Sequence, residues 1–172
     1  MTARPMITNI CELGLYSPDP DRLANFYQAV LGLEIVGRGR INADGVPVSI
    51  FLGSHQAEAA HQIAIFAQPE NKHIAFQVGS LADLRAFHQH VLACGLPIKW
   101  AFNHGISLAF YFADPAGNLI KITWFTGVSC PQPHSHPIDL SQPEAVLHQD
   151  VANLVAQLKR LKGSNNDLKS RV

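Results

Sequence analysis

Hydrophobic and polar residues first alternate along the chain and then recur at helical spacing. Residues 9–18 (NICELGLYSP) alternate, which is typical of a half-buried strand. In residues 19–31 the apolar side chains recur at helical spacing, with Asp19 or Asp21 as the candidate N-cap and Gly32 as the stop. Three short strand-like runs come next: LEIVGRG, VPVSIFLG and HQIAIFAQ. The first part of the chain is therefore predicted to form a strand, a helix and three strands.

The same order returns in the second part of the chain. A strand-like run at 73–78 precedes a helical pattern at 81–93, and the runs LPIKWAF, SLAFYFAD and NLIKITWF follow. The fragments LGLEI and CGLPI occupy the same place in each half, which indicates an internal duplication with a period of about sixty residues. Each half-sheet has one apolar face, and pairing the halves buries it. The predicted fold is α+β: two paired βαβββ modules, at about 8–68 and 72–125, form an open, barrel-like curved sheet with a funnel.

Residues 126–172 differ in pattern and are predicted to extend the domain formed by residues 1–125. The Pro-rich stretch TGVSCPQPHSHPIDL favours an extended surface arm, in which His134 and His136 would be solvated. Ser141 and Glu144 form a capping box, so an amphipathic C-terminal helix of about eighteen residues is expected. Its apolar stripe consists of Val146, Leu147, Val151, Leu154, Val155, Leu158 and Leu161. This stripe must pack either on the domain itself or on a second copy of the chain.

Composition and charge exclude several classes of partner. The 172 residues are 47% hydrophobic, and Lys+Arg and Asp+Glu both number 13, so the chain has no net charge that would attract nucleic acid or an anionic membrane. Neither a secretory leader in the first ten residues nor a membrane-spanning run is expected. The three cysteines are scattered, which fits reduced thiols in a cytoplasmic protein.

The segment 103–120, NHGISLAFYFADPAGNLI, combines a His, a Tyr and an Asp-Pro-x-Gly turn immediately before position 121. Together with AHQIAIF (60–66) and KHIAFQV (72–78), it resembles the vicinal oxygen chelate superfamily of glyoxalases, bleomycin-resistance proteins and dioxygenases. The resemblance is strongest to the type I extradiol ring-cleaving dioxygenases and covers about residues 8–125. It implies an open barrel with a small molecule in the funnel, and it implies a homodimer.

In that family, two His and one Glu hold Fe(II) or, in some members, Mn(II). The resemblance places these three ligand positions on Glu12, His73 and Lys121, so only His73 is the family's residue. It also places His104 and Tyr111 beside the substrate, as hydrogen-bonding and proton-transferring groups. His104, Tyr111 and Lys121 are therefore the candidate catalytic residues, while His73 and Glu12 are the candidate metal ligands.

Lys121 decides between the hypotheses for function. A protonated Lys repels a metal ion, but an ammonium group paired with the carboxylate of Glu12 could replace the ion, with each charge offsetting the desolvation of the other. The first hypothesis is therefore a protein without a metal cofactor that binds a small aromatic or polar molecule. The second is an enzyme, either a dioxygenase with an altered Fe(II) or Mn(II) site or a metal-free lyase or isomerase with Lys121 or His104 as base. The third is a structural or interaction protein.

His61 is a further candidate ligand. It follows Glu12 by 49 residues, close to the 48 residues between His73 and Lys121. Alignment of the strand ends instead places Ala64 at the equivalent position, and alternation along a strand then directs His61 to the opposite face. His61 is therefore expected to lie away from the site.

Overall fold

The computed structural model describes residues 5–43, 45, 47–54 and 61–169, and of residues 162–169 the backbone only. The first four residues of the segment in which no secretory leader was expected lie outside this range, as does the start of the run 60–66. The described strands are β1 (Ile7–Tyr16), β2 (Glu34–Arg38), β3 (Ser49–Gly53), β4 (Ile63–Phe66), β5 (His73–Val78), β6 (Trp100–Asn103), β7 (Ser107–Ala113), β8 (Leu119–Phe125) and β9 (His136–Pro137). The helices are α1 (Pro20–Leu31), the short 3-10 helix η1 (Pro69–Asn71), α2 (Leu81–Ala93) and α3 (Glu144–Lys169).

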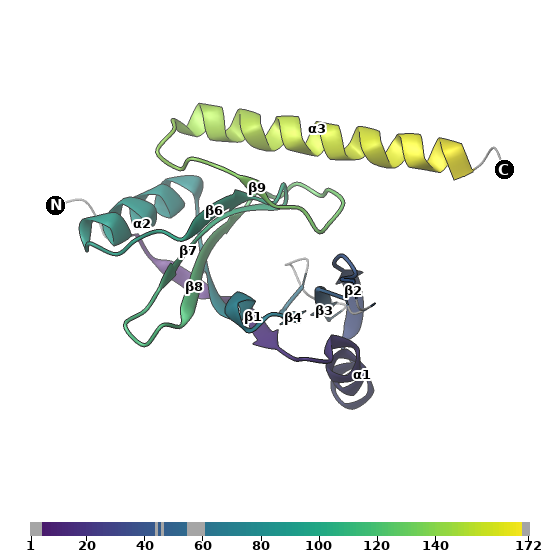
Figure 1. The fold of residues 1–172 in the computed structure, drawn as a ribbon. Helices are drawn as coiled ribbons and strands as arrows, with labels where there is room; N and C mark the ends of the chain where they lie inside the picture. The colour runs from purple at the N-terminus through teal and green to yellow at the C-terminus, as the bar shows by residue number, and fades with distance from the viewer. Residues whose placement is uncertain (1–4, 44, 46, 55–60, 170–172) are drawn as a thin grey trace.

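The strands form one curved sheet in the order β2-β3-β4-β1-β5-β8-β7-β6-β9 (Figure 1). Each predicted module supplies one half: β1 pairs in parallel with β4, and β5 pairs in parallel with β8. The two halves join where β1 and β5 run antiparallel, so one continuous sheet passes from the first module into the second. The sheet does not close on itself. The predicted α+β fold of two paired βαβββ modules is confirmed.

Helix α1 begins and ends where its predicted capping residues lie, and α2 also begins with a side-chain cap. The side chain of Asp19 accepts a hydrogen bond of 3.0 Å from the backbone N–H of Arg22, and Pro20 opens the first turn of α1. Gly32 ends α1 in the left-handed region at φ 68°, a conformation that glycine adopts without steric cost. In α2 the hydroxyl of Ser80 accepts from the backbone N–H of Asp83.

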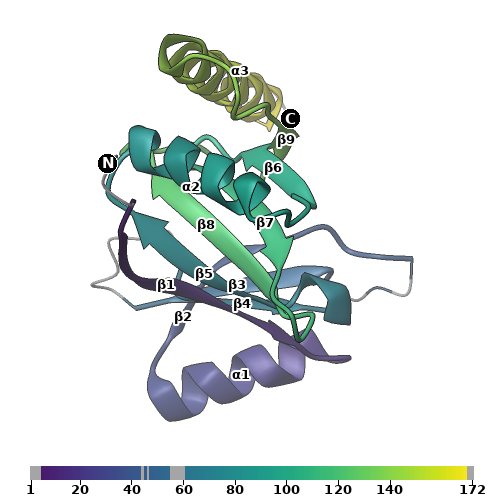
Figure 2. The same cartoon turned by 90° about the vertical axis from the view of Figure 1, so that its left-hand side faces the viewer.

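Alternation along the strands gives the sheet two chemically different faces. In β7, Leu108 and Phe110 are fully buried on the face that α2 covers, and they belong to the main core cluster. Their neighbour Tyr111 points to the opposite, concave face. A smaller core cluster lies between α1 and β3–β4, around Ala24 and Ile50. Figure 2 shows α1 and α2 near opposite ends of the sheet. The concave face between the two halves therefore carries the polar groups.

Helix α3 packs on the domain of its own chain. Its buried Leu147, Val151 and Val155 join the main core cluster together with Leu140 of the preceding arm. This answers the question that the sequence left open, because at least half of the predicted stripe is covered in cis. The predicted stripe included two residues that do not pack on the domain, since Val146 is 42% and Leu161 is 57% exposed.

The C-terminal region also departs from prediction in two elements. Helix α3 continues to Lys169 and has 26 residues, well beyond the expected length. The arm contains β9, which pairs with β6 through Phe102 and Pro137, so this part of the arm extends the sheet. None of the helices that the structure describes combines the length and the hydropathy that a membrane crossing requires.

Candidate functional site

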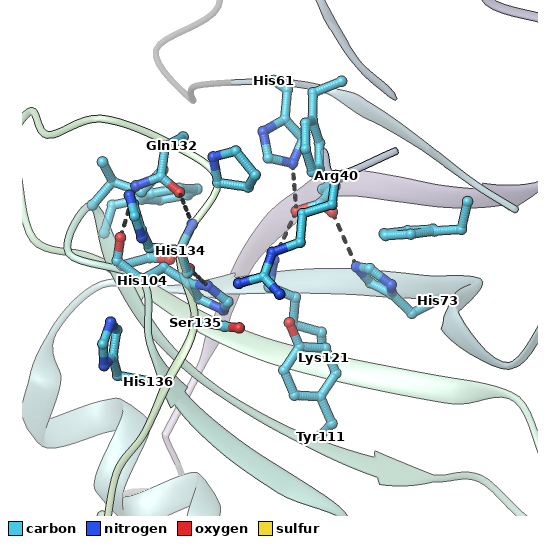
Figure 3. Close-up of a pocket in the computed structure, with 17 residues that line it drawn as sticks. Arg40, His61, His73, His104, Tyr111, Lys121, Gln132, His134, Ser135 and His136 are labelled. Atoms are coloured by element: carbon cyan, nitrogen blue, oxygen red, sulfur yellow. Dashed lines mark hydrogen bonds and ion pairs between the residues drawn. The ribbon is translucent and has the colours of Figure 1, made fainter. Parts of the chain in front are cut away.

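A cavity of about 580 Å³ opens on the concave face of the sheet (Figure 3). Strand register brings Glu12 of β1 and Lys121 of β8 together there, because both are aligned with Ala75 of the intervening strand β5. Ala75 is fully buried and small, so the two longer side chains can meet above it. Tyr111 of β7 continues the same row beyond Lys121. Three of the predicted site residues therefore lie side by side across four adjacent strands.

Glu12 and Lys121 form a buried ion pair at the base of the cavity. Lys121 Nζ donates to Glu12 Oε2 at 2.8 Å, and each residue is only 7% exposed. Burial tends to raise the pKa of Glu12, but the charge of Lys121 and hydrogen bonds from His61 and His73 outweigh it and hold the pKa well below 4.5. Burial tends to lower the pKa of Lys121, but the carboxylate of Glu12 outweighs it and raises the pKa. Both groups are therefore charged at neutral pH.

His73 is fixed between two hydrogen-bond acceptors. Its Nε2 lies 3.0 Å from Glu12 Oε1, and its Nδ1 lies 2.8 Å from the backbone oxygen of Asn71. The two contacts lie on opposite sides of the ring and fix its orientation. His73 is the first residue of β5 and lines the cavity, while its role as a metal ligand stays a prediction.

Gly14 makes room for this ring, and Gly14→Ala should displace it. A Cβ at position 14 would lie 2.7 Å from His73 Nδ1 and 2.8 Å from its backbone N, closer than side chains tolerate. We expect the variant to lose about 1–3 kcal/mol of unfolding free energy, the usual cost of overpacking, measured by urea denaturation. Gly32→Ala is not a suitable control because of its positive φ, whereas Gly37→Ala meets only Phe51 at 3.4 Å and should cost less. Equal losses in the two variants would contradict this role of Gly14.

His61 lies in the site, and the prediction that it points away was wrong. Its Nε2 is 3.3 Å from Glu12 Oε2, and its ring stacks obliquely on Phe51 with centroids 4.6 Å apart. Alternation failed as a guide because β4 starts at Ile63, so His61 precedes the strand and strand parity does not apply to it. The spacing of 49 residues from Glu12 was the correct signal. His61, His73 and Lys121 thus all contact the carboxylate of Glu12.

His104 presents a buried, unpartnered nitrogen. Its Nδ1 lies 2.6 Å from the backbone oxygen of His134 and must donate to it, which leaves Nε2 as a hydrogen-bond acceptor. Among the described residues no group bonds to this Nε2, although water cannot reach it. Burial, reinforced by the charge of Lys121, lowers the pKa of His104 to about 4, so the ring is neutral at neutral pH.

Tyr111 provides a polar group on an aromatic wall. Its ring centroid is 5.7 Å from that of His73 and 5.9 Å from Lys121 Nζ, and burial raises the pKa of its hydroxyl. The predicted neighbours His104, Tyr111 and Lys121 therefore line the same cavity.

Two parts of the cavity wall were not expected from the sequence. The arm was predicted to be solvated, yet residues 132–136 line the cavity, and Gln132 Nε2 donates to the backbone oxygen of His104 at 2.8 Å. His134 is half-buried, whereas His136 is exposed as expected. Arg40 also lines the cavity, and in Figure 3 its guanidinium extends over Lys121 and Tyr111. Nothing in the pattern around Arg40 distinguishes it from a surface residue.

The polar side chains at the base of the cavity are not arranged around a vacant metal position among the described residues. Within the part of the chain that the structure describes, no group of three or more His, Cys, Asp or Glu side chains is arranged to hold a metal ion. The two imidazoles and the ammonium instead all direct N–H groups to the carboxylate of Glu12. This arrangement can neutralise a buried charge and orient the rings around it.

A family model connects this geometry with known proteins. The model of the Glyoxalase/Bleomycin resistance protein/Dioxygenase superfamily matches residues 9–122. The chain belongs to this superfamily. The resemblance that the sequence alone indicated is thereby confirmed, and it spans both modules and the row from Glu12 to Lys121.

Solved structures of superfamily members share the fold. The Mn(II)-bound glyoxalase from Novosphingobium aromaticivorans is 24% identical with a TM-score of 0.58, over 70% of this chain and 40% of its own. The 2,3-dioxygenase LapB from Pseudomonas sp. KL28 is 23% identical with a TM-score of 0.60, over 77% and 46%. A catechol 2,3-dioxygenase is 20% identical with a TM-score of 0.59, over 81% and 49%. The matches cover less than half of each of these chains, and no curated protein matches this one.

Proposed function

We propose that this protein binds a small molecule in its cavity and holds no iron or manganese there. One contact carries the proposal: Lys121 Nζ lies 2.8 Å from Glu12 Oε2 in a buried pair. The resemblance places a metal-binding Glu at position 121. A protonated Lys offers no lone pair to a metal, and its charge repels a cation. Lys121 would thus replace the ion electrostatically instead of binding it.

The other two ligand positions support the same conclusion. Glu12 stands where the resemblance places a His, and its oxygens already accept from Lys121, His73 and His61. Only His73 is the family's residue, and one imidazole does not retain Fe(II) or Mn(II). The donor set therefore does not fit the metal of the relatives, and His104 and Tyr111 would serve as hydrogen-bonding groups for the ligand.

The test is metal binding, with a rebuilt site as the control. The purified protein should contain no stoichiometric iron or manganese, and anaerobic addition of Fe(II) or Mn(II) should leave its Tm unchanged. The double variant Glu12→His/Lys121→Glu restores the family's ligand set, and its Tm should rise in the same titration. At a free metal concentration of about 100 Kd the gain would be about 2.7 kcal/mol.

Stoichiometric metal in the parent protein would overturn the proposal. It would favour the alternative, a ring-cleaving dioxygenase with an altered ligand set, for which oxygen uptake on catechol after iron reconstitution is the decisive assay. A metal-free lyase or isomerase is the other enzymatic alternative. The neutral Nε2 of His104 could accept a proton in such a reaction, whereas Lys121 could not, because its pKa is raised.

A further inference from the structure

Strand β1 crosses the middle of the sheet without a helix over it. It is fourth in the order of nine strands, between β4 and β5. On the convex face, α1 packs mainly on β2, β3 and β4, and α2 packs mainly on β5 and β8. Figure 2 shows β1 passing between the two helices. These helices therefore leave open the convex face of a central strand.

The open part of the convex face is apolar. Ile10 pairs with Phe76 across the seam between β1 and β5, and Leu13 pairs with Ile74. Phe76 packs against the main core cluster, and paired residues share a face, so Ile10 and Leu13 lie on the convex face. A bulge separates Ile10 from Glu12, which points into the cavity. Ile10 is 65% and Leu13 42% exposed, although a solvated sheet face normally carries polar side chains.

Helix α1 also presents an uncharged face to the outside. Residues 23–33 (LANFYQAVLGL) contain no charged residue. On the inner side of the helix, Ala24 is buried in the smaller core cluster. On the outer side, Phe26 is 54%, Val30 61% and Leu31 60% exposed. The solvent side of a surface helix normally carries charged side chains, so the outer side of α1 has the composition of a covered surface.

The two exposed surfaces adjoin each other. Leu13 is aligned with Ile63 of β4, and Ile63 packs against the core cluster beneath α1. Apolar side chains thus continue from the open strand to the helix beside it. This surface, the seam patch, consists of Ile10, Leu13, Phe26, Val30 and Leu31. Continuous exposed apolar patches mark sites of protein association, whereas single exposed apolar residues do not.

The absence of charge favours a second copy of the chain as the partner. Interfaces between identical subunits are more apolar than those of transient complexes, and their centres are depleted of charged residues. A two-fold interface uses the same patch on both subunits, so a charged patch would repel itself and a neutral patch does not. The whole chain has 13 basic and 13 acidic residues, so two copies have no net charge that keeps them apart.

The relief of the seam patch also suits two-fold association. Helix α1 stands above the sheet, whereas the neighbouring β1 has neither α1 nor α2 over it (Figure 2). In a two-fold pair, α1 of each copy can pack on β1 of the other copy. This arrangement covers both parts of the patch on both subunits.

We propose that a second copy of this chain covers the seam patch, with α1 of each copy packed on the convex face of β1 of the other. The resemblance implies a homodimer without indicating its surface, and the seam patch supplies that surface. The inference is independent of the proposed function, because the seam patch and the cavity lie on opposite faces of the sheet.

Sedimentation of the full chain tests this arrangement. The parent should sediment as a dimer, at twice its mass of 18.8 kDa. Phe26→Glu and Ile10→Lys should each sediment as monomers, with a dimer Kd raised at least about 100-fold, because each variant buries an unpaired charge in both equivalent contacts. Leu161→Glu is the matched control. Leu161 is 57% exposed on α3, outside the seam patch, so its variant should remain dimeric.

A mixture of two variants tests which elements meet. In a mixed dimer of Phe26→Glu with Ile10→Lys, the two opposite charges fall in the same contact, and the second contact keeps the parental residues. The mixture should therefore form a heterodimer, although neither variant dimerises alone. A mixture that stays monomeric would contradict the packing of α1 on β1.

A parent that stays monomeric up to its highest soluble concentration would overturn the inference. A parental dimer that survives both Phe26→Glu and Ile10→Lys would overturn it as well, and a monomeric Leu161→Glu would place the interface on α3 instead. Phe26 and Ile10 are exposed in the single chain, so both variants should keep the parental circular dichroism spectrum. Val30→Glu tests the same face if either of them does not fold.

Discussion

Lys121→Met should lower the free energy of unfolding by about 3–5 kcal/mol, because it leaves the carboxylate of Glu12 buried without its cation. Glu12 is only 7% exposed, and Lys121 supplies its hydrogen bond of 2.8 Å. Met preserves most of the volume of the Lys side chain, so the loss reports charge rather than a cavity. Urea denaturation of parent and variant at pH 7 measures it.

Two further variants separate a buried pair from an ordinary salt bridge. Glu12→Gln/Lys121→Met removes both charges and should recover most of the lost stability. Arg38→Met breaks the exposed pair with Asp21, whose side chains are about half accessible, and should cost less than about 1 kcal/mol. A Lys121→Met variant as stable as the parent would refute the buried pair.

The pH dependence gives the same pair a second signature. Glu12 has a folded pKa lowered well below its unfolded value of 4.5. Its contribution to stability is therefore complete above pH 4.5 and is lost as the pH falls toward the folded pKa. The double variant Glu12→Gln/Lys121→Met should lack this acid-sensitive contribution.

Leu147→Ala should have the second large effect, a loss of about 2–5 kcal/mol of unfolding free energy. Leu147 is fully buried and joins α3 to the main core cluster, where it shares the cluster with Leu108 and Phe110. The truncation would leave a cavity between the helix and the sheet. Thermal or urea unfolding measures the loss.

Leu161→Ala is the matched control, since Leu161 lies on the same helix and is 57% exposed. Its effect should stay within about 0.5 kcal/mol. A loss as large as that of Leu147→Ala would mean that this face is covered by another molecule, as the interaction-protein hypothesis requires. The homodimer implied by the resemblance stays a prediction, and sedimentation of the parent and Leu161→Ala would test both points.

The sequence predicted the repeated elements of the fold well, because short-range physics sets them. Alternation and helical spacing located the strands and helices of both modules, and Asp19 and Gly32 marked the limits of α1. The structure of the arm could not be predicted in the same way. The pairing of β9 with β6 depends on backbone contacts between residues far apart in the chain, and side-chain patterns do not indicate such contacts.

The family resemblance predicted Glu12, His73 and Lys121 as site positions. All three lie within strands, and the register of β1, β5 and β8 places them on the concave face. His61 lies before β4, so the rule that side chains alternate along a strand predicted the wrong face for it. Arg40 lies outside a regular element, so only the folded chain reveals that its side chain reaches the cavity.

The contact between Glu12 and Lys121 also couples the two halves of the duplicated fold. The partners are 109 residues apart and belong to different modules, on either side of the seam between β1 and β5. Opening that seam would separate the two charged groups and break their hydrogen bond of 2.8 Å, so the contact ties the first module to the second. The ion pair between Glu12 and Lys121 thus helps the two repeated modules to unfold as one cooperative unit.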